Sequence, residues 1–469
     1  MKHFSSRLCP MTALLFPMLA MAADAANPIE ARFAQLRSDP PSLYAFLLRM
    51  PKGGDLHNHV SGAIYAESYL RAAAADGLCV DQRAGAIVAA DSSGGCGANL
   101  PAARAESDNT LRDALIDSLS MRNFVAGRES GHDHFFAAFN KFGPIDSKHR
   151  GEFLAEVTAR AAEQNESYLE LMGINGSAAN ALGDQAGFDG NYDAARARLD
   201  ANGGLDKVVD AMRTRIAGME KARLAALGCD AKPAPAPCRV VVRYVLEVLR
   251  ESPLQRVFAE ILAGLRLASV DPLVVGINFV QPEDGVVSMR DYSLQMKMVA
   301  YARKLYPKVH VSLHAGELAL GLVPPDQLRF HVREAVDVAG ADRIGHGVDI
   351  LYETGSRALM ERMRQRHVLV EINLTSNDQI LGVRGEDHPF NAYRRAGVPL
   401  ALSTDDEGVA RSHLTAEFLR AVLTYKLTYA DVKEMARNSL RYAFLDDSSK
   451  AQLEKDLEER FRAFEASER

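Results

Sequence analysis

The sequence predicts an α/β protein built as a (β/α)8 barrel of the TIM type, with an N-terminal helical extension and extra helices. Eight short apolar, β-branched runs alternate with longer helical stretches, which is typical of a parallel sheet covered by helices. Histidine and acidic side chains stand at or just after the ends of several of these runs. Because the carboxyl ends of the strands form the active-site face of such a barrel, we expect those side chains to meet there.

The expected elements follow one another along the chain without an evident internal repeat. Strands are expected over residues 54–59, 167–173, 239–248, 272–280, 308–316, 342–347, 367–375 and 398–406. Helices are expected over residues 111–127, 151–165, 293–307, 327–340 and 356–366, and residues 27–50 are expected to form a helical entry segment. A doubly wound open sheet is the alternative, but it would not gather side chains from the first, fifth and eighth strands. A closed barrel gathers these side chains at one end, because the eighth strand returns beside the first.

The composition is that of an ordinary globular protein. The 469 residues suffice for one large domain with embellishments, or for two ordinary domains. Hydrophobic residues make up 47% and charged residues 25%, which excludes a disordered or collagen-like chain. Lys and Arg number 55 against 61 Asp and Glu, so the formal net charge is −6. Nothing in this balance favours a nucleic acid as partner.

The first 26 residues resemble a cleavable secretory signal. They carry Lys2 and Arg7, continue through the apolar run 8–22 and end in small-x-small sites. This run is too short to span a bilayer, and no polar stripe marks it as a buried amphipathic helix, the alternative reading. We therefore expect residues 1–26 to be a signal peptide, and the mature protein to be exported to the periplasm or the medium without a stable membrane anchor.

The four remaining cysteines form two local groups. Cys79 and Cys96 bracket a short Gly-rich loop, and Cys229 and Cys238 bracket a Pro-rich loop. Closing such short loops costs less chain entropy than joining distant segments, so we expect disulfides between 79 and 96 and between 229 and 238. A metal site is the alternative, but no CxxC spacing supports it.

A candidate metal site begins with the pair His57 and His59. The two imidazoles alternate along a strand, so they face the same side and can share one metal ion. Alone, such a pair is more often two polar surface or core histidines. His314 in HAGE and Asp405 in STDD add a third nitrogen and a carboxylate from strand ends that a barrel brings together. Three histidines and one aspartate suit one Zn²⁺ per chain with room for a water.

Groups suited to proton transfer lie beside these residues. Glu317 follows His314 by three positions, His346 stands between glycines in GHG, and Asp406 adjoins Asp405. Each has a structural alternative, because Glu317 could cap a helix, His346 could be a buried hydrogen-bonded residue and Asp406 could shape a turn. Their common position at one end of the expected barrel favours catalysis.

These residues resemble a known family. MPKGGDLHNH (50–59), HAGE (314–317), GHG (345–347) and STDDEG (403–408) are similar to the motifs of the adenosine deaminase family. The PKGG opening, the signal and the N-terminal extension resemble its secreted, growth-factor-related branch and bacterial exported relatives. The resemblance covers about residues 50–445 and implies that residues 51–469 form a metal-dependent deaminase barrel. It further implies zinc-dependent hydrolysis of adenosine and deoxyadenosine to inosine plus ammonia, in purine salvage outside the cytoplasm.

The resemblance also implies a role for each matching residue. The metal ligands would be His57, His59, His314 and Asp405. Glu317 would donate a proton to purine N1, and His346 would orient and deprotonate the water. Asp405 would also help to aim the nucleophile, and Asp406 would accept a hydrogen bond from the N7 side of the purine. Residues 276–284 offer no lysine, whereas two-metal hydrolases with a similar HxH opening usually have a modified one there, so one metal is expected.

The chain also departs from the family pattern. Ser61 stands where much of the family has an acidic residue that contacts the ribose. A glycine whose backbone donates to purine N3 is replaced by residues 280–283, where Gln281 or nearby backbone could substitute. Ser376 and Asn377 are expected to support the site, although shaping a turn is the alternative. The loop 79–96 is far shorter than the receptor-binding insertion of the secreted branch, so a cell-surface binding role has little support.

These departures leave other functions open. A different aminopurine deaminase, or another amidohydrolase on the same barrel, is the second reading, motivated by Ser61 and Gln281. A catalytically dead secreted binding protein is the third, and the intact acids and His346 argue against it. The expected partner is a small purine nucleoside, and residues 27–50 leave a homodimer open.

Overall fold

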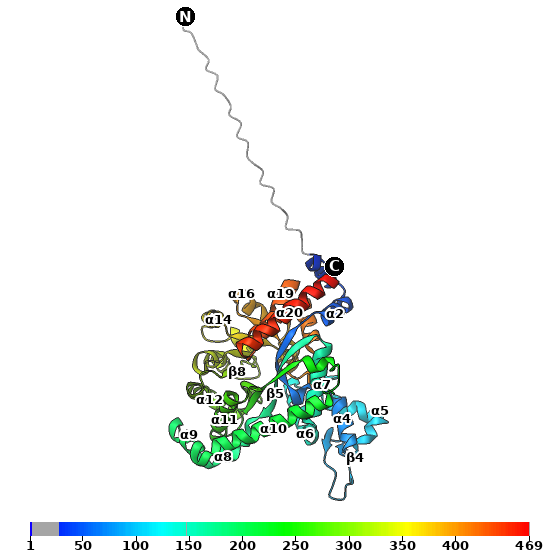
Figure 1. Ribbon diagram of the computed structural model, residues 1–469, viewed down its shortest axis with the longest axis vertical. Helices are drawn as coiled ribbons and strands as arrows, with labels where there is room; N and C mark the ends of the chain where they lie inside the picture. Colours follow the sequence, from blue (N-terminus) through cyan, green and yellow to red (C-terminus); the bar gives the residue numbers. More distant parts are fainter. Residues whose placement is uncertain (2–27, 147, 469) are drawn as a thin grey trace.

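The computed structural model contains the predicted barrel (Figure 1) and describes residue 1 and residues 28–146 and 148–468. Eight parallel strands succeed one another around the sheet in chain order. They are β1 (Gly53–His59), β5 (Glu166–Asn175), β6 (Val241–Leu249), β7 (Val274–Val280), β8 (His310–Ala315), β9 (Arg343–His346), β10 (Leu369–Ile372) and β11 (Leu400–Leu402). A parallel bridge between Asn58 and Asp405 links the end of the sheet to its beginning. The barrel is therefore nearly closed, and the predicted fold class is confirmed. The expected signal peptide, 1–26, lies outside the described residues apart from Met1.

Each expected strand is present, but the last two are shorter than their apolar runs. β10 has four residues and β11 has three, whereas strands over 367–375 and 398–406 were expected. The chain leaves the ladder early because it turns into short helices at the carboxyl end of the barrel. These are α15 (Leu374–Leu381) and α17 (Glu407–Ala410). The polar ends of both runs are thereby placed at the barrel mouth.

Helices cover the outside of the barrel. Two of the expected ones, α7 (Arg150–Glu163) and α14 (Ser356–Gln365), agree closely with the structure. A third, α12 (Val286–Leu305), is present but begins seven residues before the expected range 293–307. A further helix, α11 (Leu254–Val270), buries ten residues against its neighbours. Within the described residues, no helix combines the length and the apolar character needed to cross a membrane.

Two expected helices differ from the structure. The helix expected over 111–127 is α5 (Asn109–Ser118) and ends early. The Ser120 hydroxyl donates a 2.6 Å hydrogen bond to the Ile116 carbonyl, and Asn123 has a φ of 61° that a right-handed helix cannot contain. The segment 327–340 is broken into three pieces, η5 (Gln327–Arg329), α13 (His331–Glu334) and the π-helical turn η6 (Ala335–Ala339).

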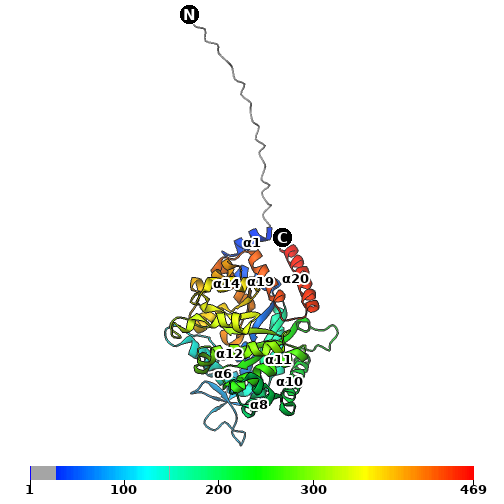
Figure 2. The ribbon, with the colours of Figure 1, turned by 90° about the vertical axis from the view of Figure 1, so that its left-hand side faces the viewer.

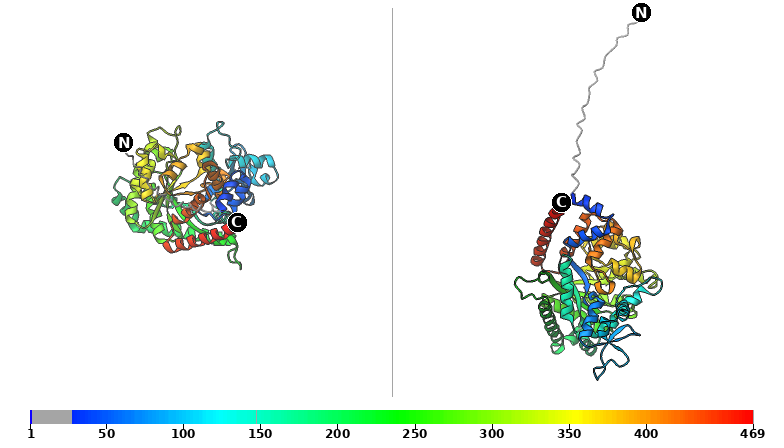
Figure 3. Two further views of the ribbon diagram at one scale, coloured as in Figure 1. Left: turned by 90° about the horizontal axis from the view of Figure 1, so that it is seen from above. Right: turned by 90° about the vertical axis from the view of Figure 1, so that its right-hand side faces the viewer.

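The N-terminal extension packs against the C-terminal helix. It consists of α1 (Pro28–Leu36) and α2 (Pro40–Arg49), as expected of a helical entry segment, and the C-terminal helix is α20 (Asp447–Ser467). Figures 2 and 3 show α1 beside α20 at one end of the molecule. Arg32 and Arg49 reach the carboxylate of Glu468 at 2.9 and 2.6 Å. The extension is therefore part of the folded unit.

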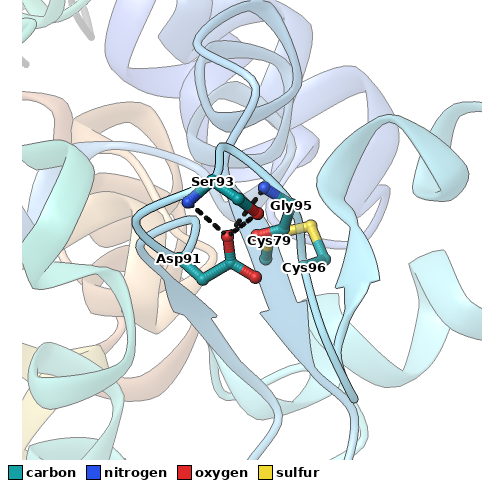
Figure 4. The surroundings of a disulfide bond; sticks show 5 residues. All are labelled: Cys79, Asp91, Ser93, Gly95 and Cys96. Atoms are coloured by element: carbon teal, nitrogen blue, oxygen red, sulfur yellow. Dashed lines mark hydrogen bonds between the residues drawn. A yellow bond between two sulfur atoms is a disulfide. The ribbon is translucent and has the colours of Figure 1, made fainter.

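A small subdomain is inserted between the first two barrel strands, where the sequence indicated a loop. It contains an antiparallel sheet of β2 (Cys79–Asp81), β3 (Ala86–Val88) and β4 (Leu100–Pro101). Cys79 is bonded to Cys96, and the Asp91 carboxylate beside this disulfide accepts the N–H groups of Ser93 and Gly95 (Figure 4). The second expected disulfide, Cys229 with Cys238, is also present. Both pairings are therefore confirmed.

Candidate metal centre and active site

Four potential metal ligands converge at the carboxyl end of the barrel. They are His57 and His59 of β1, His314 of β8 and Asp405 just after β11, and their ligand atoms lie within 4.8 Å of one another. Nε2 of His314 is 3.0 Å from Nε2 of His57 and 3.2 Å from Nε2 of His59. Oδ1 of Asp405 is 3.5 and 3.3 Å from the same two nitrogens. The strands thus bring together the four residues that the sequence singled out.

These spacings fit a single tetrahedral ion. Ligands about 2.0–2.1 Å from a zinc ion stand about 3.3–3.4 Å apart when the coordination is tetrahedral, which is close to the observed separations. Three imidazoles and one carboxylate suit a divalent transition metal. The described residues at the end of β7 hold no lysine that could bridge a second ion. The four-residue group therefore fits one metal ion, and a second group of potential ligands, Glu317, His346 and Asp405, shares its aspartate.

Partners on the far side of two rings aim their Nε2 atoms at the centre. Nδ1 of His57 lies 2.6 Å from Oε2 of Glu371, and Nδ1 of His314 lies 2.9 Å from Oδ1 of Asn278. Such partners orient metal-binding histidines and fix their tautomer. The sequence analysis missed both, although each is a polar residue inside an otherwise apolar strand run. Glu371 is itself held by buried Arg343, whose Nε donates to Oε1 at 2.6 Å.

The electrostatics of the centre favour a proton on His57 and oppose one on His314, where burial and the charges of neighbouring histidines lower the pKa well below its ordinary value. Burial opposes charge on His57, but its hydrogen bonds to Asp405 and Glu371 outweigh burial and raise the pKa of the imidazole to about 10. At Asp405, burial alone would raise the pKa of the carboxyl group. The hydrogen bond from His57 and the charges of nearby histidines outweigh burial and lower that pKa. Because a metal binds neutral imidazole, it has to displace a proton from His57. The centre is therefore arranged to hold a cation.

Glu317 and His346 stand beside the ligands in complementary protonation states. Oε1 of Glu317 is 3.7 Å from Nδ1 of His346, and Nε2 of His346 is 3.9 Å from Oδ2 of Asp405. Burial and the charge of Asp405 raise the pKa of Glu317 to about 8. Burial, partly offset by Asp405, lowers the pKa of His346 to about 3. Near neutral pH the site thus holds a protonated acid beside a neutral imidazole, which is the pairing that acid–base catalysis uses.

The two expected supporting residues contact the site directly. The Ser376 hydroxyl donates a 2.6 Å hydrogen bond to Oδ2 of Asp405, and Nδ2 of Asn377 lies 2.9 Å from Nδ1 of His346. Both belong to α15, whose start at the end of β10 places them there. They hold an acid and a base in position, beyond shaping a turn.

Asp406 offers a free polar atom to the cavity. Oδ1 of Asp406 is buried and has no hydrogen-bond partner among the described residues. Burial and the neighbouring Asp405 raise the pKa of this carboxyl group well above its ordinary value. Its position depends on Gly62, because a Cβ added there would lie 1.6 Å from Oδ1 of Asp406. A buried, unpaired carboxyl oxygen is costly unless a ligand satisfies it.

Backbone strain gathers at the same strand ends. Gln281, His346 and Asp405 have φ values of 81°, 67° and 62°. Residues other than glycine rarely adopt this left-handed region, and they persist there when the surrounding structure imposes it, often at functional sites. Each of the three follows or ends a different barrel strand, so the strain marks the barrel mouth independently of side-chain chemistry.

A cavity of about 410 Å³, lined by three of the four ligands, opens at the barrel mouth, and its volume is within the usual range for small-molecule sites. Its lining is polar at the base and apolar on one side. The lining residues are His59, Ser61, Phe135, Phe136, Phe139, Asn140, Glu247, Val280, Gln281, Pro282, His314, Glu317, Ile380, Asp405 and Asp406. The apolar side comes largely from α6 (Gly131–Asp146), which the sequence analysis did not identify. All three expected substrate contacts, Ser61, Gln281 and Asp406, are in the lining.

The carboxylate of Glu283, which was not predicted from the sequence, holds the backbone of the HAGE segment (314–317) in place. Oε1 of Glu283 accepts the N–H of Gly316 at 3.0 Å, and Oε2 accepts the N–H of Glu317 at 2.8 Å. Nδ1 of His331 lies 2.6 Å from the same carboxylate. Glu283 is fully buried beside Arg250, 3.8 Å away. This clamp sets the direction in which Glu317 leaves the strand.

Comparison with known proteins agrees with this geometry. The family model described as adenosine deaminase matches residues 206–460. An adenosine deaminase of Enterococcus faecalis is 31% identical over 189 residues, which are 40% of this chain and 51% of that protein. The chain thus spans about half the length of the curated relatives it matches.

Solved structures of similar fold include two purine deaminases. The adenine deaminase from Arthrobacter aurescens has a TM-score of 0.57 and 17% identity, covering 87% of this chain and 98% of that one. The apo N6-methyl-AMP deaminase from Arabidopsis thaliana has a TM-score of 0.58 and 19% identity, covering 89% and 98%. At these identities the likeness shows the fold.

Proposed function

Because the chain belongs to the adenosine deaminase family, we propose that it is a zinc-dependent hydrolase that deaminates adenosine and deoxyadenosine and releases ammonia. One observation carries the proposal: a buried group of three histidines and an aspartate adjoins a protonated Glu317 and a neutral His346. Four of them, His59, His314, Asp405 and Glu317, line a cavity large enough for a purine nucleoside.

The four ligands would hold one zinc ion. When bound, such an ion lowers the pKa of a coordinated water toward about 7 and supplies a nucleophile at neutral pH. His57 and His314 are held for this task by Glu371 and Asn278. Asp405, fixed by Ser376, orients the nucleophile toward the ring.

Glu317 and His346 move the protons. Glu317 donates its proton to N1, which makes C6 electrophilic, while water adds its oxygen to C6 and gives one proton to His346. The carbon becomes tetrahedral. The C6–N6 bond then breaks, ammonia leaves with the proton from His346, and the remaining hydroxyl proton returns to Glu317. The ring retains hydrogen on N1 and oxygen on C6, so inosine is the product and both residues are restored.

Asp406 binds the other side of the ring, as a donor. N7 of adenosine carries a lone pair and no hydrogen, so a contact with it requires a protonated carboxyl group. The raised pKa of Asp406 supplies one. Asp406 was expected to accept this hydrogen bond, so the residue is the one predicted but the direction of the bond is reversed. The contact with N7 also gives a partner to the buried Oδ1 of Asp406, which otherwise has none among the described residues.

The cavity lining favours a nucleoside over a nucleotide. Among the described residues that line it, none is lysine or arginine, and a phosphate group is normally met by such cations or by a helix N-terminus. Arg250 lies behind the wall, bonded through Nε to the carbonyl of Gln281 and fully buried. Adenine is the second candidate substrate, because Ser61 leaves position 61 without the acidic residue that contacts ribose in much of the family.

Export and extracellular purine salvage complete the proposal. The basic and apolar start of the chain supports export, and two disulfides are typical of proteins in an oxidising compartment.

A substrate panel tests the proposal. Ammonia release by the purified chain is measured with adenosine, 2′-deoxyadenosine, adenine, AMP and N6-methyl-AMP at equal concentrations. We expect the two nucleosides to react fastest. A chain that turned over adenine or a nucleotide faster than either nucleoside would move the assignment to that substrate.

A further inference from the structure

One carboxylate in the cavity has no role in the chemistry proposed above. Glu247 lies near the end of β6 and lines the cavity, with its side chain 14% exposed. Its carboxylate accepts no hydrogen bond from any described residue, and Nδ1 of His59 lies 3.7 Å from Oε1. Among the buried acids of the site, Glu371 and Glu283 hold a histidine and backbone groups, and Glu317 and Asp406 are assigned above to the purine ring. Glu247 is therefore a hydrogen-bond acceptor available to a ligand.

Glu247 and Ser61 flank the same histidine. Ser61 follows His59 by two residues and also lines the cavity, while Glu247 approaches His59 from β6. The position that carries an acidic sugar contact in much of the family is therefore neutral here, and a carboxylate enters the same region from another strand. The carboxylate that could accept a hydrogen bond from the sugar is therefore found on β6, at Glu247, instead of at position 61.

The orientation of the bound purine directs its sugar toward this region. With N1 at Glu317 and N7 at Asp406, N9 lies on the five-membered ring, on the Asp406 side of the base. Asp406 follows the last strand and Ser61 the first, and these are neighbours at the barrel seam. Glu247, Ser61 and Asp406 all line the same cavity. A sugar on N9 is thus placed among Asp406, Ser61 and Glu247.

We propose that Glu247 is a specificity-determining residue whose carboxylate accepts hydrogen bonds from the sugar hydroxyls of the nucleoside; this rests on the proposed function. A carboxylate is an acceptor with two oxygens, and hydroxyl donors to it form strong, charge-assisted bonds. The same charge repels a phosphate ester, and none of the described lining residues is a lysine or arginine that could offset that repulsion. Glu247 therefore favours the nucleoside over both the free base and the nucleotide.

A structural role for Glu247 makes a different prediction. If the carboxylate served to orient His59, its loss would weaken metal binding and affect every substrate alike. The 3.7 Å separation exceeds a hydrogen bond, unlike the 2.6 Å contact that Glu371 makes with His57. Measuring both substrate selectivity and metal affinity in a Glu247 variant therefore distinguishes a sugar contact from a role in orienting His59.

The test compares wild type with Glu247→Gln, each loaded with zinc. The kcat and KM values are measured for adenosine, adenine and AMP, together with zinc affinity. We expect the ratio of kcat/KM for adenosine to that for adenine to fall about 10- to 100-fold, the size expected for a hydrogen bond to a charged group, mainly through the KM for adenosine. The AMP-to-adenosine ratio should rise. Unchanged ratios, or a loss of zinc affinity that lowers all activities equally, would overturn the proposal.

Two further measurements sharpen the result. Adding Ser61→Asp to Glu247→Gln should restore part of the preference for adenosine, since it places a carboxylate just after the first strand; no recovery would count against a shared subsite. Calorimetric binding of inosine and hypoxanthine gives the same comparison without turnover. If wild type releases no ammonia but Glu247→Gln still loses inosine affinity relative to hypoxanthine, the proposed reaction fails while the sugar contact stands. Wild-type affinities that do not differ between the two ligands would refute the sugar contact itself.

Discussion

His59 and Asp405 are joined both through their backbones and through their side chains. The N–H of His59 donates a 2.9 Å hydrogen bond to the carbonyl of Asp405, and Nε2 of His59 lies 3.3 Å from Oδ1 of Asp405. The N–H of Asp405 in turn donates to the carbonyl of His57 at 2.9 Å. The seam that nearly closes the barrel is therefore also one edge of the metal centre, so folding and assembly of the ligand set are coupled.

Replacing the acid and replacing a ligand should separate turnover from metal binding. Glu317→Gln removes the proton for N1 but no ligand atom, so we expect metal content near wild type and a kcat lower by about 10²- to 10⁴-fold. Asp405→Ala should lower both metal content and turnover. Metal analysis and ammonia release on the same samples make the comparison. Equal metal loss in the two variants would contradict the assigned roles.

Ser376 should tune the metal site from outside the ligand set. Ser376→Ala removes the 2.6 Å hydrogen bond to Oδ2 of Asp405, and loss of such supporting contacts typically costs about 10- to 100-fold in metal affinity or activity. Competition with a chelator of known affinity measures the change. Ser269→Ala is a control, because that hydroxyl is exposed and donates to a helix carbonyl far from the site. Identical affinities in the two variants would leave Ser376 without the role described.

Gly62 should be intolerant of a methyl group. In Gly62→Ala the new Cβ would lie 1.6 Å from Oδ1 of Asp406, so the acid has to move out of its position and kcat/KM should fall at least about tenfold. Gly218→Ala is the matched control, because nothing lies within 4 Å of the added Cβ in its exposed helix. That control should keep activity and gain about 0.5–1 kcal/mol of stability. Full activity in Gly62→Ala would show that Asp406 does not need this position.

The contact between His132 and Asp284 should stabilise the protein in a pH-dependent way. It ties the start of α6, which lines the cavity, to the loop after β7, with Nε2 of His132 2.9 Å from Oδ1 of Asp284. Burial opposes the charged imidazole, but Asp284 and Asp133 raise the pKa of His132 to about 9 from an ordinary 6.5. Because the folded pKa is the higher one, this stabilisation is complete below about pH 6.5 and is lost as the pH rises through about 9.

Melting curves check this sign. His132→Gln should lower Tm at pH 6, and the difference from wild type should shrink by pH 10. In an Asp284→Asn background most of the effect should disappear, since the partner is already gone. A Tm difference that grew with pH would mean that His132 is bound as the neutral ring.

Much of this architecture is predictable from the sequence, for physical reasons. Parallel strands buried on both faces leave long apolar, β-branched runs, so all eight strands could be located, and site residues such as His57 and Asp405 could be placed at one barrel face. The lengths of β10 and β11 could not, because the polar residues that end both runs could equally well continue a strand into the barrel mouth, whereas the chain turns there into the helices α15 and α17. The small sheet of β2 to β4 was also not predicted. Its strands have two or three residues each, which is too short to give a periodic pattern in the sequence.

The supporting residues were harder to predict than the ligands. Glu371, Asn278 and Glu283 act through contacts between strands that are distant in the chain, so no local spacing reveals them. Glu247 lies in a run that reads as an ordinary strand, and its availability follows from what does not contact it in the folded chain. The catalytic motifs are local, whereas the residues that orient them and select the substrate depend on the closed barrel.

The most direct test of the account is a metal titration of the metal-free chain, with ammonia release from adenosine as the readout. The account predicts no turnover without metal, recovery in proportion to added Zn²⁺ and saturation at one ion per chain. Turnover that persists in the metal-free chain, or that requires two ions per chain, would contradict the single His57, His59, His314 and Asp405 centre on which the account depends.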